Sequence, residues 1–194
     1  MTPSKASSEP GLAGVPILLG VTGSIAAYKA ADLASRLVQA GAEVRAALTA
    51  AAGEFVTPLT FETLTGNPVY SGMFGENRAR GAAHISLAEF PKLAVIAPAS
   101  ADFIGKMACG LADDLLSAVV MATRAHLLLA PGMNSGMWEN SAVRENVRRL
   151  KERGVEFVGP ESGYLACGYE GPGRLASVDK IIAAVTAILS RPGR

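Results

Sequence analysis

Short apolar runs alternate with longer amphipathic stretches along the middle of this 194-residue chain. Continuous apolar runs bounded by Gly, Pro or polar residues are typical of strands that are covered on both faces. Such runs predict strands at 17–21, 43–48, 93–97, 127–130 and 155–158. Stretches with apolar residues at helical spacing predict helices at 24–39, 111–123, 135–153 and 178–189, and Thr49 is placed to cap a further short helix.

The alternation of short strands and helices predicts an α/β fold: a mostly parallel sheet with helices on both faces. Residues 15–190 show no linker or internal repeat, so we expect a single domain there. Residues 1–14 are rich in Pro, Ser and Gly, and this composition predicts a disordered lead-in.

Composition narrows the classes of function. The formal net charge is +1, which argues against nucleic acid or an anionic membrane as the main partner. Two cysteines exclude a disulfide scaffold. The chain shows neither an apolar run long enough to span a bilayer nor a signal-peptide pattern at its N-terminus. We therefore expect a soluble, cytoplasmic protein.

The carboxyl ends of parallel strands meet at one edge of a sheet, where ligands bind. After the first predicted strand, Gly23 and Ser24 stand at a helix start, where N–H groups and the helix dipole favour an anion such as a phosphate. The spacing is neither a dinucleotide fingerprint nor a phosphate-binding lysine motif, so one phosphate of a mononucleotide fits best. A plain helix cap explains the same residues.

Two further hydroxyls follow neighbouring predicted strands. Thr49 comes after the second strand and Ser100 after the third. Either residue alone could be a structural N-cap. Three hydroxyl-bearing strand ends at one sheet edge indicate a ligand site.

Four residues have a chemical interpretation beside a structural one. Asn134 could orient a substrate carboxylate or merely cap a helix. His84 could be a base or a structural residue. Cys167 lies in segment 160–174, where Gly and Pro exclude a helix and a flap over a ligand is expected. Cys109 is expected to pack within a helix.

Other chemistries find no support in the sequence. His84 and His126 lie far apart and have no cysteine or carboxylate pattern beside them, so we predict no metal site. A nucleophile-elbow motif for an acyl-enzyme is also absent.

Five motifs, taken in this order, are similar to those of one known family. They are GVTGSIAAYK at 20–29, HISL at 84–87, APASADFIGKMACGLADDLL at 97–116, APGMNSGMW at 130–138 and LACGYEGPGR at 165–174. On these motifs the chain resembles the homo-oligomeric flavin-containing cysteine decarboxylases. The resemblance covers most of the chain and implies a doubly wound, flavodoxin-like (Rossmann-type) fold that binds FMN.

The resemblance also assigns roles to residues. His84 would be the catalytic base and Cys167 the proton donor on a substrate clamp near 160–174. Asn134, with Met137 beside it, would bind the substrate carboxylate. The residues that would bind FMN are Gly23, Ser24, Ile25, Thr49, Ala51, Ser100, Ala101, Asp102, Phe103, Gly132 and Met133.

The family chemistry implies the reaction. A flavin takes a hydride from the cysteine Cβ, the resulting thioaldehyde accepts electrons as CO₂ leaves, and an enethiolate results. Reduction of that product to a saturated thiol would need the Cys167 proton. In the family FMN lies between subunits of a trimer, and trimers can build a dodecamer.

Two substrates remain open at this stage. The clamp sequence resembles that of enzymes acting on phosphopantothenoylcysteine in coenzyme A biosynthesis, which in bacteria are commonly fused to a synthetase. This chain stops at Arg194, and stand-alone members often decarboxylate the C-terminal cysteine of a precursor peptide. A non-catalytic flavoprotein subunit is a weaker alternative. Two positions depart from the family pattern: Gly132 replaces a usual Ala, and Asp113 a usual Asn.

Overall fold

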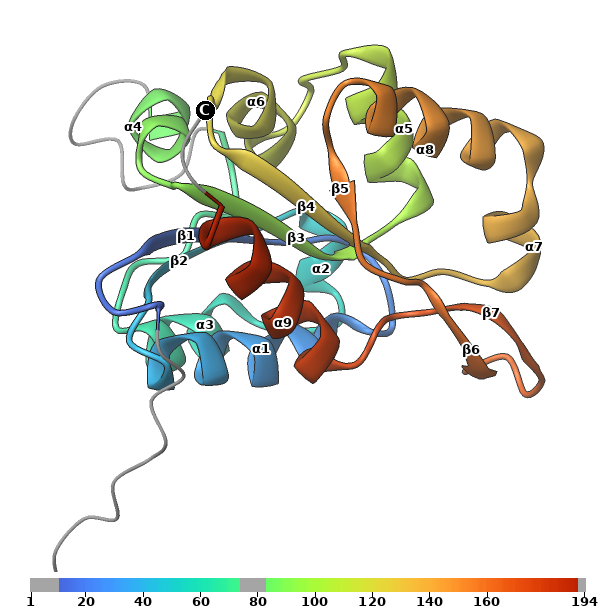
Figure 1. Ribbon diagram of the computed structural model, residues 1–194, viewed down its shortest axis with the longest axis horizontal. Helices are drawn as coiled ribbons and strands as arrows, with labels where there is room; N and C mark the ends of the chain where they lie inside the picture. Colours follow the sequence, from blue (N-terminus) through green and yellow to red (C-terminus); the bar gives the residue numbers. More distant parts are fainter. Residues whose placement is uncertain (1–10, 74–82, 192–194) are drawn as a thin grey trace, which may run out of the picture.

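Five parallel strands form the central sheet of the computed structural model, which describes residues 11–73 and 83–191 (Figure 1). The strand order is β2-β1-β3-β4-β5, and each neighbouring pair is parallel. This order is that of a flavodoxin-like, doubly wound sheet, so the predicted fold class is confirmed. The strands are β1 (Pro16–Val21), β2 (Glu43–Leu48), β3 (Leu93–Ala99), β4 (His126–Pro131) and β5 (Glu156–Phe157).

Helices cover both faces of the sheet (Figure 1). Successive strand residues point to opposite faces: Leu19 belongs to one apolar cluster and Leu18 to the other. The first cluster is covered by α1 (Ala27–Gln39), α3 (Pro58–Thr65) and α9 (Val178–Leu189). The second is covered by α4 (Ala83–Glu89), α5 (Ala101–Cys109), α6 (Leu115–Ala122) and α8 (Ser141–Glu152).

Three smaller elements lie around the carboxyl ends of the strands. Helix α2 (Ala50–Gly53) follows β2, and helix α7 (Ser135–Glu139) follows β4. The antiparallel hairpin of β6 (Glu161–Tyr164) and β7 (Glu170–Arg174) projects from the sheet beside α7. The segment that contains Cys167 is therefore a hairpin, in agreement with the prediction that it is not a helix.

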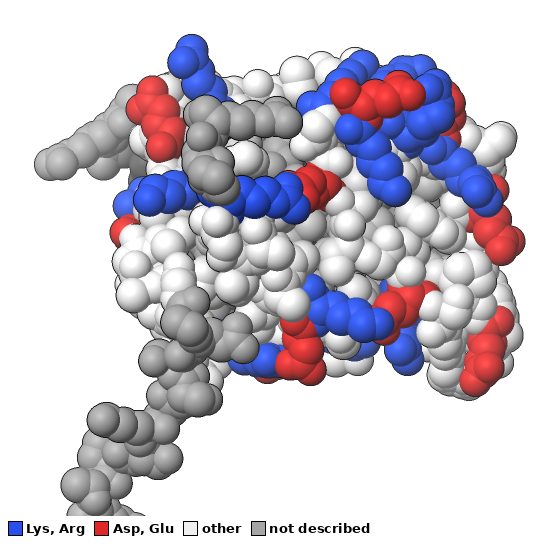
Figure 2. Space-filling model, viewed as in Figure 1, with Lys and Arg blue, Asp and Glu red and all other residues white. Residues whose placement is uncertain are grey.

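The surface over α8 carries charges of both signs (Figure 2). Arg148 pairs there with Glu145 at 2.7 Å and also with Glu152. Positive charge on this helix is thus matched by negative charge. Among the helices that the structure describes, none combines the length and the apolar character that a bilayer crossing requires.

The predicted strands agree with the observed strands to within a few residues, and the predicted helices differ mainly at their starts. The segment 43–48 has the predicted bounds, whereas the helix predicted from Ser24 begins at Ala27, because residues 24–26 form a turn in which the Ala27 N–H donates to the Ser24 carbonyl. Of the predicted lead-in, residues 1–10 lie outside the described residues. Residues 11–14 are ordered, because Leu12 is buried in the core and the Gly14 N–H donates to the Gly41 carbonyl.

Helix caps account for two other corrections. The helix predicted at 135–153 is two helices, because the Asn140 side chain accepts the Ala142 N–H and starts α8. The helix predicted at 111–123 begins at Leu115, because Asp114 and Ser117 form a capping box. Helices α3, α4 and α5 were not among the predicted ranges. Cys109 ends α5 with its side chain exposed, so the prediction that it packs was wrong.

Hydrogen bonds of the Thr22 side chain link the end of β1 to the end of β3. Its hydroxyl donates to the Pro98 carbonyl at 2.7 Å and accepts the Ser100 N–H at 2.8 Å, and Thr22 is almost fully buried. The Thr22 N–H donates to the same Pro98 carbonyl at 3.3 Å, so the backbone and the side chain of Thr22 both join the two strand ends. Thr22 therefore sets how the loops after β1 and β3 lie relative to each other.

Replacing Thr22 by Val should lower the free energy of unfolding by about 1–3 kcal/mol, because the Ser100 N–H would remain buried without an acceptor. Urea unfolding of the purified variant measures the change. The matched control is Thr63→Val, which removes an exposed hydroxyl bonded to the Leu59 carbonyl and should change stability by no more than about 0.5 kcal/mol. Equal effects of the two variants would show that the Thr22 bonds contribute nothing specific.

Candidate active site

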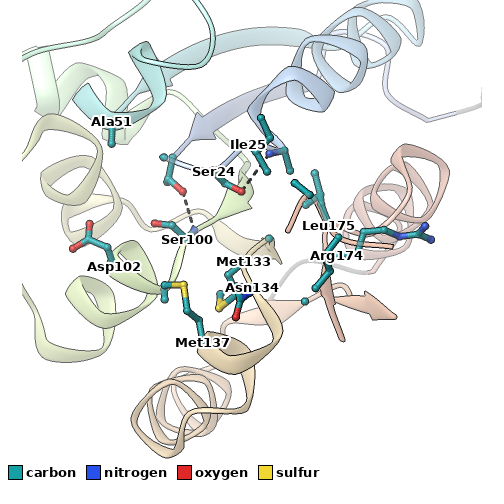
Figure 3. Close-up of a pocket in the computed structure, with 18 of the residues that line it drawn as sticks. Ser24, Ile25, Ala51, Ser100, Asp102, Met133, Asn134, Met137, Arg174 and Leu175 are labelled. Carbon is teal, nitrogen blue, oxygen red and sulfur yellow. Dashed lines mark hydrogen bonds between the residues drawn. The ribbon is translucent and has the colours of Figure 1, made fainter. Parts of the chain in front are cut away.

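A cavity of about 840 Å³ opens at the carboxyl ends of the strands, a volume typical of small-molecule sites. Segments that follow β1, β2, β3 and β4 line it, together with the hairpin (Figure 3). The cavity lies where β1 and β3 run side by side, at the point where the strand order reverses.

The structure brings most of the predicted site residues into this one cavity. They come from five separate segments of the chain. Those that line it are Gly23, Ser24, Ile25, Thr49, Ala51, Ser100, Ala101, Asp102, Gly132, Met133, Asn134, Met137 and Cys167.

Two predicted residues do not line the cavity. The Phe103 side chain is buried in the core beneath α5, and its N–H donates to the Ser100 hydroxyl, so its prediction as a cofactor contact is not supported by its placement. His84 lies in the first turn of α4, which packs against α6. In Figure 1, α4 lies at the left of the molecule and the hairpin of β6 and β7 at the right.

The helices that start at the cavity differ in how they are capped. The Thr49 hydroxyl accepts the Ala52 N–H at 3.2 Å to cap α2, and the Ser100 hydroxyl caps α5 through Phe103. The N-cap residue of helix α1, Ala26, makes no side-chain cap bond and the first turn holds no acidic residue, although the Ser24 hydroxyl accepts the Ala26 N–H at 3.3 Å. An uncapped N-terminus that faces a cavity suits an anion, because its N–H groups and the helix dipole attract negative charge.

Glycines allow the loops to approach closely around this helix start. A Cβ on Gly23 would lie 2.6 Å from the Ala51 Cβ, so only Gly lets the turn after β1 pack on α2. A Cβ on Gly132 would lie 3.1 Å from the Pro98 Cβ. The floor of the cavity therefore depends on small residues in the loops after β1 and β4.

Lys106 lines the cavity with three carboxylates around it. Its Nζ lies 3.0 Å from Asp113, 3.1 Å from Asp114 and 3.5 Å from Asp102. Burial alone would lower the pKa of Lys106, but the hydrogen bonds to Asp113 and Asp114 outweigh it and raise that pKa above its ordinary value. Burial opposes ionisation of Asp114 too, yet the Ser117 N–H and Lys106 hold the pKa of Asp114 below its usual value. Lys106 is therefore charged and already neutralised.

Two other cations line the cavity. Arg174 donates to Glu161 at 3.0 Å, and its side chain leads away from the cavity centre (Figure 3). Lys29 has no carboxylate partner among the described residues; its ammonium lies 5.9 Å from the centre of the Tyr28 ring. Within the described part of the chain, Lys29 is thus the cation best placed to meet an anionic ligand.

The hairpin docks on the loop after β4 through backbone contacts. The Met133 N–H donates to the Gly173 carbonyl at 2.9 Å, and the Ser135 hydroxyl donates to the Pro172 carbonyl at 2.7 Å. Gly173 has a φ of +123°, and any side chain there would collide with the Met133 carbonyl oxygen. The docking therefore requires Gly at this position.

Asn134 lies where this docked hairpin meets the cavity. Its Oδ1 accepts the Gly136 N–H at 2.8 Å and caps α7. Its Nδ2 donates to the Tyr169 hydroxyl at 2.6 Å and lies 3.4 Å from the Cys167 sulfur. The cap and the ligand interpretations of Asn134 are compatible, because the oxygen caps the helix while the amide N–H groups face the hairpin.

Residues in or next to the cavity that were not singled out from the sequence include Thr22, Lys29, Lys106 and Tyr169. The spacing of Asp102 and Lys106 by one helical turn could have indicated an ion pair. Tyr169 lies in a segment rich in Gly and Pro, where no periodicity shows which side chains face inward. Thr22 could have been found as a buried polar residue at the end of an apolar strand.

Comparison with known proteins places these motifs in a family. The sequence matches the Flavoprotein family over residues 5–190. It is 44% identical over 180 residues to the coenzyme A biosynthesis bifunctional protein CoaBC of Haemophilus influenzae, an alignment that covers 93% of this chain and 45% of the relative. The chain thus spans about half the length of the curated relatives it matches.

Two solved structures are similar over almost their full length. A Cys-to-Ser mutant of PPC decarboxylase in complex with pantothenoylaminoethenethiol superposes with a TM-score of 0.82 at 29% identity, over 92% of this chain and 100% of that chain. The FMN-dependent cysteine decarboxylase SpaF superposes with a TM-score of 0.79 at 33% identity, over 93% and 100%.

The ion pairs of Glu161 should make the hairpin sensitive to acid. Lys180 at 2.8 Å and Arg174 at 3.0 Å hold the pKa of Glu161 at about 2, below its usual 4.5. Because this pKa is lower in the folded than in the unfolded protein, the stability that Glu161 contributes is complete above pH 4.5 and is lost as the pH falls towards 2. Glu161→Gln should therefore be less stable than the wild type at pH 7, by a margin that shrinks below pH 4.5.

Urea unfolding of both proteins between pH 7 and pH 3 measures this margin. The control is Glu54→Gln, which removes an exposed carboxylate that forms no ion pair within the described residues. Its difference from the wild type should not depend on pH. If the difference in free energy of unfolding between Glu161→Gln and the wild type stayed constant with pH, the ion pairs of Glu161 would not stabilise the fold.

Proposed function

The chain belongs to the flavoprotein family that includes the flavin-containing cysteine decarboxylases, and on this premise we propose that it is an FMN-dependent decarboxylase of a terminal cysteinyl carboxylate. The reaction removes CO₂ from the cysteine and gives an enethiolate. Residues 15–190 would form the catalytic domain, with the hairpin as substrate clamp.

One observation carries this proposal: the amide of Asn134 and the thiol of Cys167 meet at the same cavity, with Nδ2 and Sγ 3.4 Å apart. The amide N–H can donate to a substrate carboxylate, and the thiol is a proton donor. Their juxtaposition puts a carboxylate ligand beside a group that can protonate the neighbouring carbon after CO₂ has left.

The cavity fits FMN by its own features. The uncapped start of α1, the hydroxyl of Ser24 and the ammonium of Lys29 provide donors and positive charge for a single phosphate. The segment has no second glycine placed to admit a pyrophosphate. The apolar side chains of Met133, Met137 and Leu175 provide surface for a planar ring system.

When bound, FMN would accept a hydride from the cysteine Cβ and so create the thioaldehyde into which the carboxylate electrons move as CO₂ leaves. The residues of the chain do the rest. Asn134 binds the carboxylate and orients it, and Met137 contacts the substrate beside it. Cys167 holds the proton that a saturated thiol product would need. Ser100 and Thr49 keep the loops around the cavity in place through their caps.

The base would come from a second copy of the chain. His84 does not line the cavity of its own chain, although imidazole is the side chain suited to proton transfer near neutral pH. Large apolar side chains that line the cavity, such as Ile25 and Tyr28, are 57% and 61% exposed, and a neighbouring subunit would cover them. We therefore propose a homotrimer, able to build a dodecamer, in which His84 of one subunit completes the cavity of the next.

Phosphopantothenoylcysteine is the substrate that we favour. The greater identity to CoaBC, 44% against 33% for SpaF, supports it. The alternative is a peptide that ends in cysteine, and the similarity to the FMN-dependent cysteine decarboxylase SpaF, over 93% of this chain, is compatible with it.

The purified protein should be yellow, release FMN on heating and remove CO₂ from phosphopantothenoylcysteine, as mass spectrometry of the product would record. A parallel incubation with a peptide that ends in cysteine decides between the two substrates. Cys167→Ser should still release CO₂. It should stop at a product lighter by two hydrogen atoms than the saturated thiol, because the Cys167 thiol that would protonate the enethiolate is missing.

Two results would contradict this scheme. Released FAD, or a colourless protein that does not bind added flavin, would rule out the cofactor. Formation of the saturated thiol by Cys167→Ser at the wild-type rate would remove Cys167 from its role. If the wild type itself stops at the lighter product, the chain carries out the oxidative decarboxylation alone.

Mixing two inactive variants tests whether His84 acts in the neighbouring subunit. His84→Asn lacks the base, and Asn134→Asp should repel the substrate carboxylate. In trimers assembled one to one from the two variants, about a quarter of the sites carry both native side chains if each site is shared between subunits. Decarboxylation should return to about that fraction of the wild-type rate.

The control is each variant unfolded and reassembled alone, which should stay inactive. Mixed trimers could also retain flavin and the mass of a trimer but show no activity. That result would contradict a site shared between subunits, because His84 and Asn134 would then act in the same subunit or one of them would not act in catalysis.

A further inference from the structure

We propose that Tyr169 is a positioning residue for the carboxylate site: it holds the Asn134 amide in the orientation that presents one N–H to the substrate carboxylate. The inference rests on the proposed function and deepens it. Tyr169 does not line the cavity, so it would act through Asn134 and not by touching the substrate.

The orientation of the Asn134 amide follows from its partners. A backbone N–H can only donate, so the atom that accepts the Gly136 N–H at 2.8 Å must be Oδ1. The opposite atom, Nδ2, then faces the hairpin with two N–H groups. Tyr169 accepts one of them at 2.6 Å.

The two N–H groups of Asn134 are bound unequally. Sulfur is a weak acceptor, and the Cys167 sulfur lies 3.4 Å from Nδ2, whereas the Tyr169 oxygen is a good acceptor at 2.6 Å. A carboxylate oxygen would therefore displace Cys167 and leave the Tyr169 contact intact. The vacated N–H lies on the cavity side, because Cys167 lines the cavity and Tyr169 does not.

The same contact ties the tip of the clamp to the loop after β4. The docking bonds of the hairpin, from Met133 and Ser135, reach only β7, at Gly173 and Pro172. Tyr169 precedes β7, and within the described residues its hydroxyl makes the strong side-chain contact between the hairpin tip and Asn134. Removing it would free both the amide and the tip that carries Cys167.

The test is Tyr169→Phe, which keeps the ring and removes only the acceptor. The KM for the cysteinyl substrate should rise about five-fold, the effect of losing a single hydrogen bond, with kcat changed less than two-fold. The effect falls on KM because the carboxylate charge that Asn134 contacts is present in the bound substrate and disappears as CO₂ leaves. Tyr70→Phe, which removes a phenol hydroxyl outside the cavity, should change neither constant.

A ligand without the carboxylate separates an effect on the carboxylate contact from an effect on the binding of the rest of the substrate. The decarboxylated counterpart of the substrate, which ends in a thiol, serves as a competitive inhibitor. Its inhibition constant should be the same for Tyr169→Phe and the wild type. An inhibition constant that weakens as much as KM, or a fall in kcat with KM unchanged, would overturn the proposal.

A second measurement needs neither substrate nor activity. Cys109 is exposed on α5 and Cys167 is exposed at the hairpin tip, so one alkylation experiment reports on both. In Tyr169→Phe, iodoacetamide should label Cys167 about five-fold faster than in the wild type, with Cys109 as the unchanged reference. Equal labelling of Cys167 in both proteins would overturn the role of Tyr169. Failure of the wild type to release CO₂, with faster labelling in the variant, would overturn the proposed function alone.

Discussion

The cavity depends on β1 and β3 lying side by side while the chain leaves their ends towards opposite faces of the sheet. Parallel strands force both ends to the same edge, and the divergence of α1 and α5 opens a gap between the two loops. Thr22 fixes the width of that gap by bonding one buried hydroxyl to the Pro98 carbonyl and the Ser100 N–H. The starts of α1 and α5 therefore take their positions from the sheet.

The other side of the cavity is built by glycines. Gly173 lets the hairpin backbone contact the loop after β4, and Gly23 lets the turn after β1 contact α2. Each contact brings a polar side chain to the cavity from a distant part of the sequence: Cys167 meets Asn134 although 33 residues separate them. Backbone docking is stiff, so the positions of the amide and the thiol follow from it with little freedom.

The strands and the ligand edge could be predicted because apolar runs and strand-end hydroxyls are local signals, as Thr49 and Ser100 illustrate. The start of α1 and the break at Asn140 could not, because whether a polar residue ends or begins a helix depends on which backbone N–H its side chain reaches. The exposure of Cys109 depends on which face of α5 packs on α8. The inward-facing residues of the hairpin, above all Tyr169, follow from docking and leave no periodic pattern.

The described part of the cavity of one chain lacks the base that the proposed decarboxylation needs. The described residues that line the cavity include the start of α1, the Asn134 amide and the Cys167 thiol, and none of them is a histidine. Its lysine at α5 is held by three aspartates and cannot act as a base at neutral pH, because those ion pairs raise the pKa of Lys106. In the mechanism proposed above, the base would therefore come from outside the cavity wall. The exposed apolar rim, which includes Tyr164 and Met137, would be the surface across which a second copy brings it.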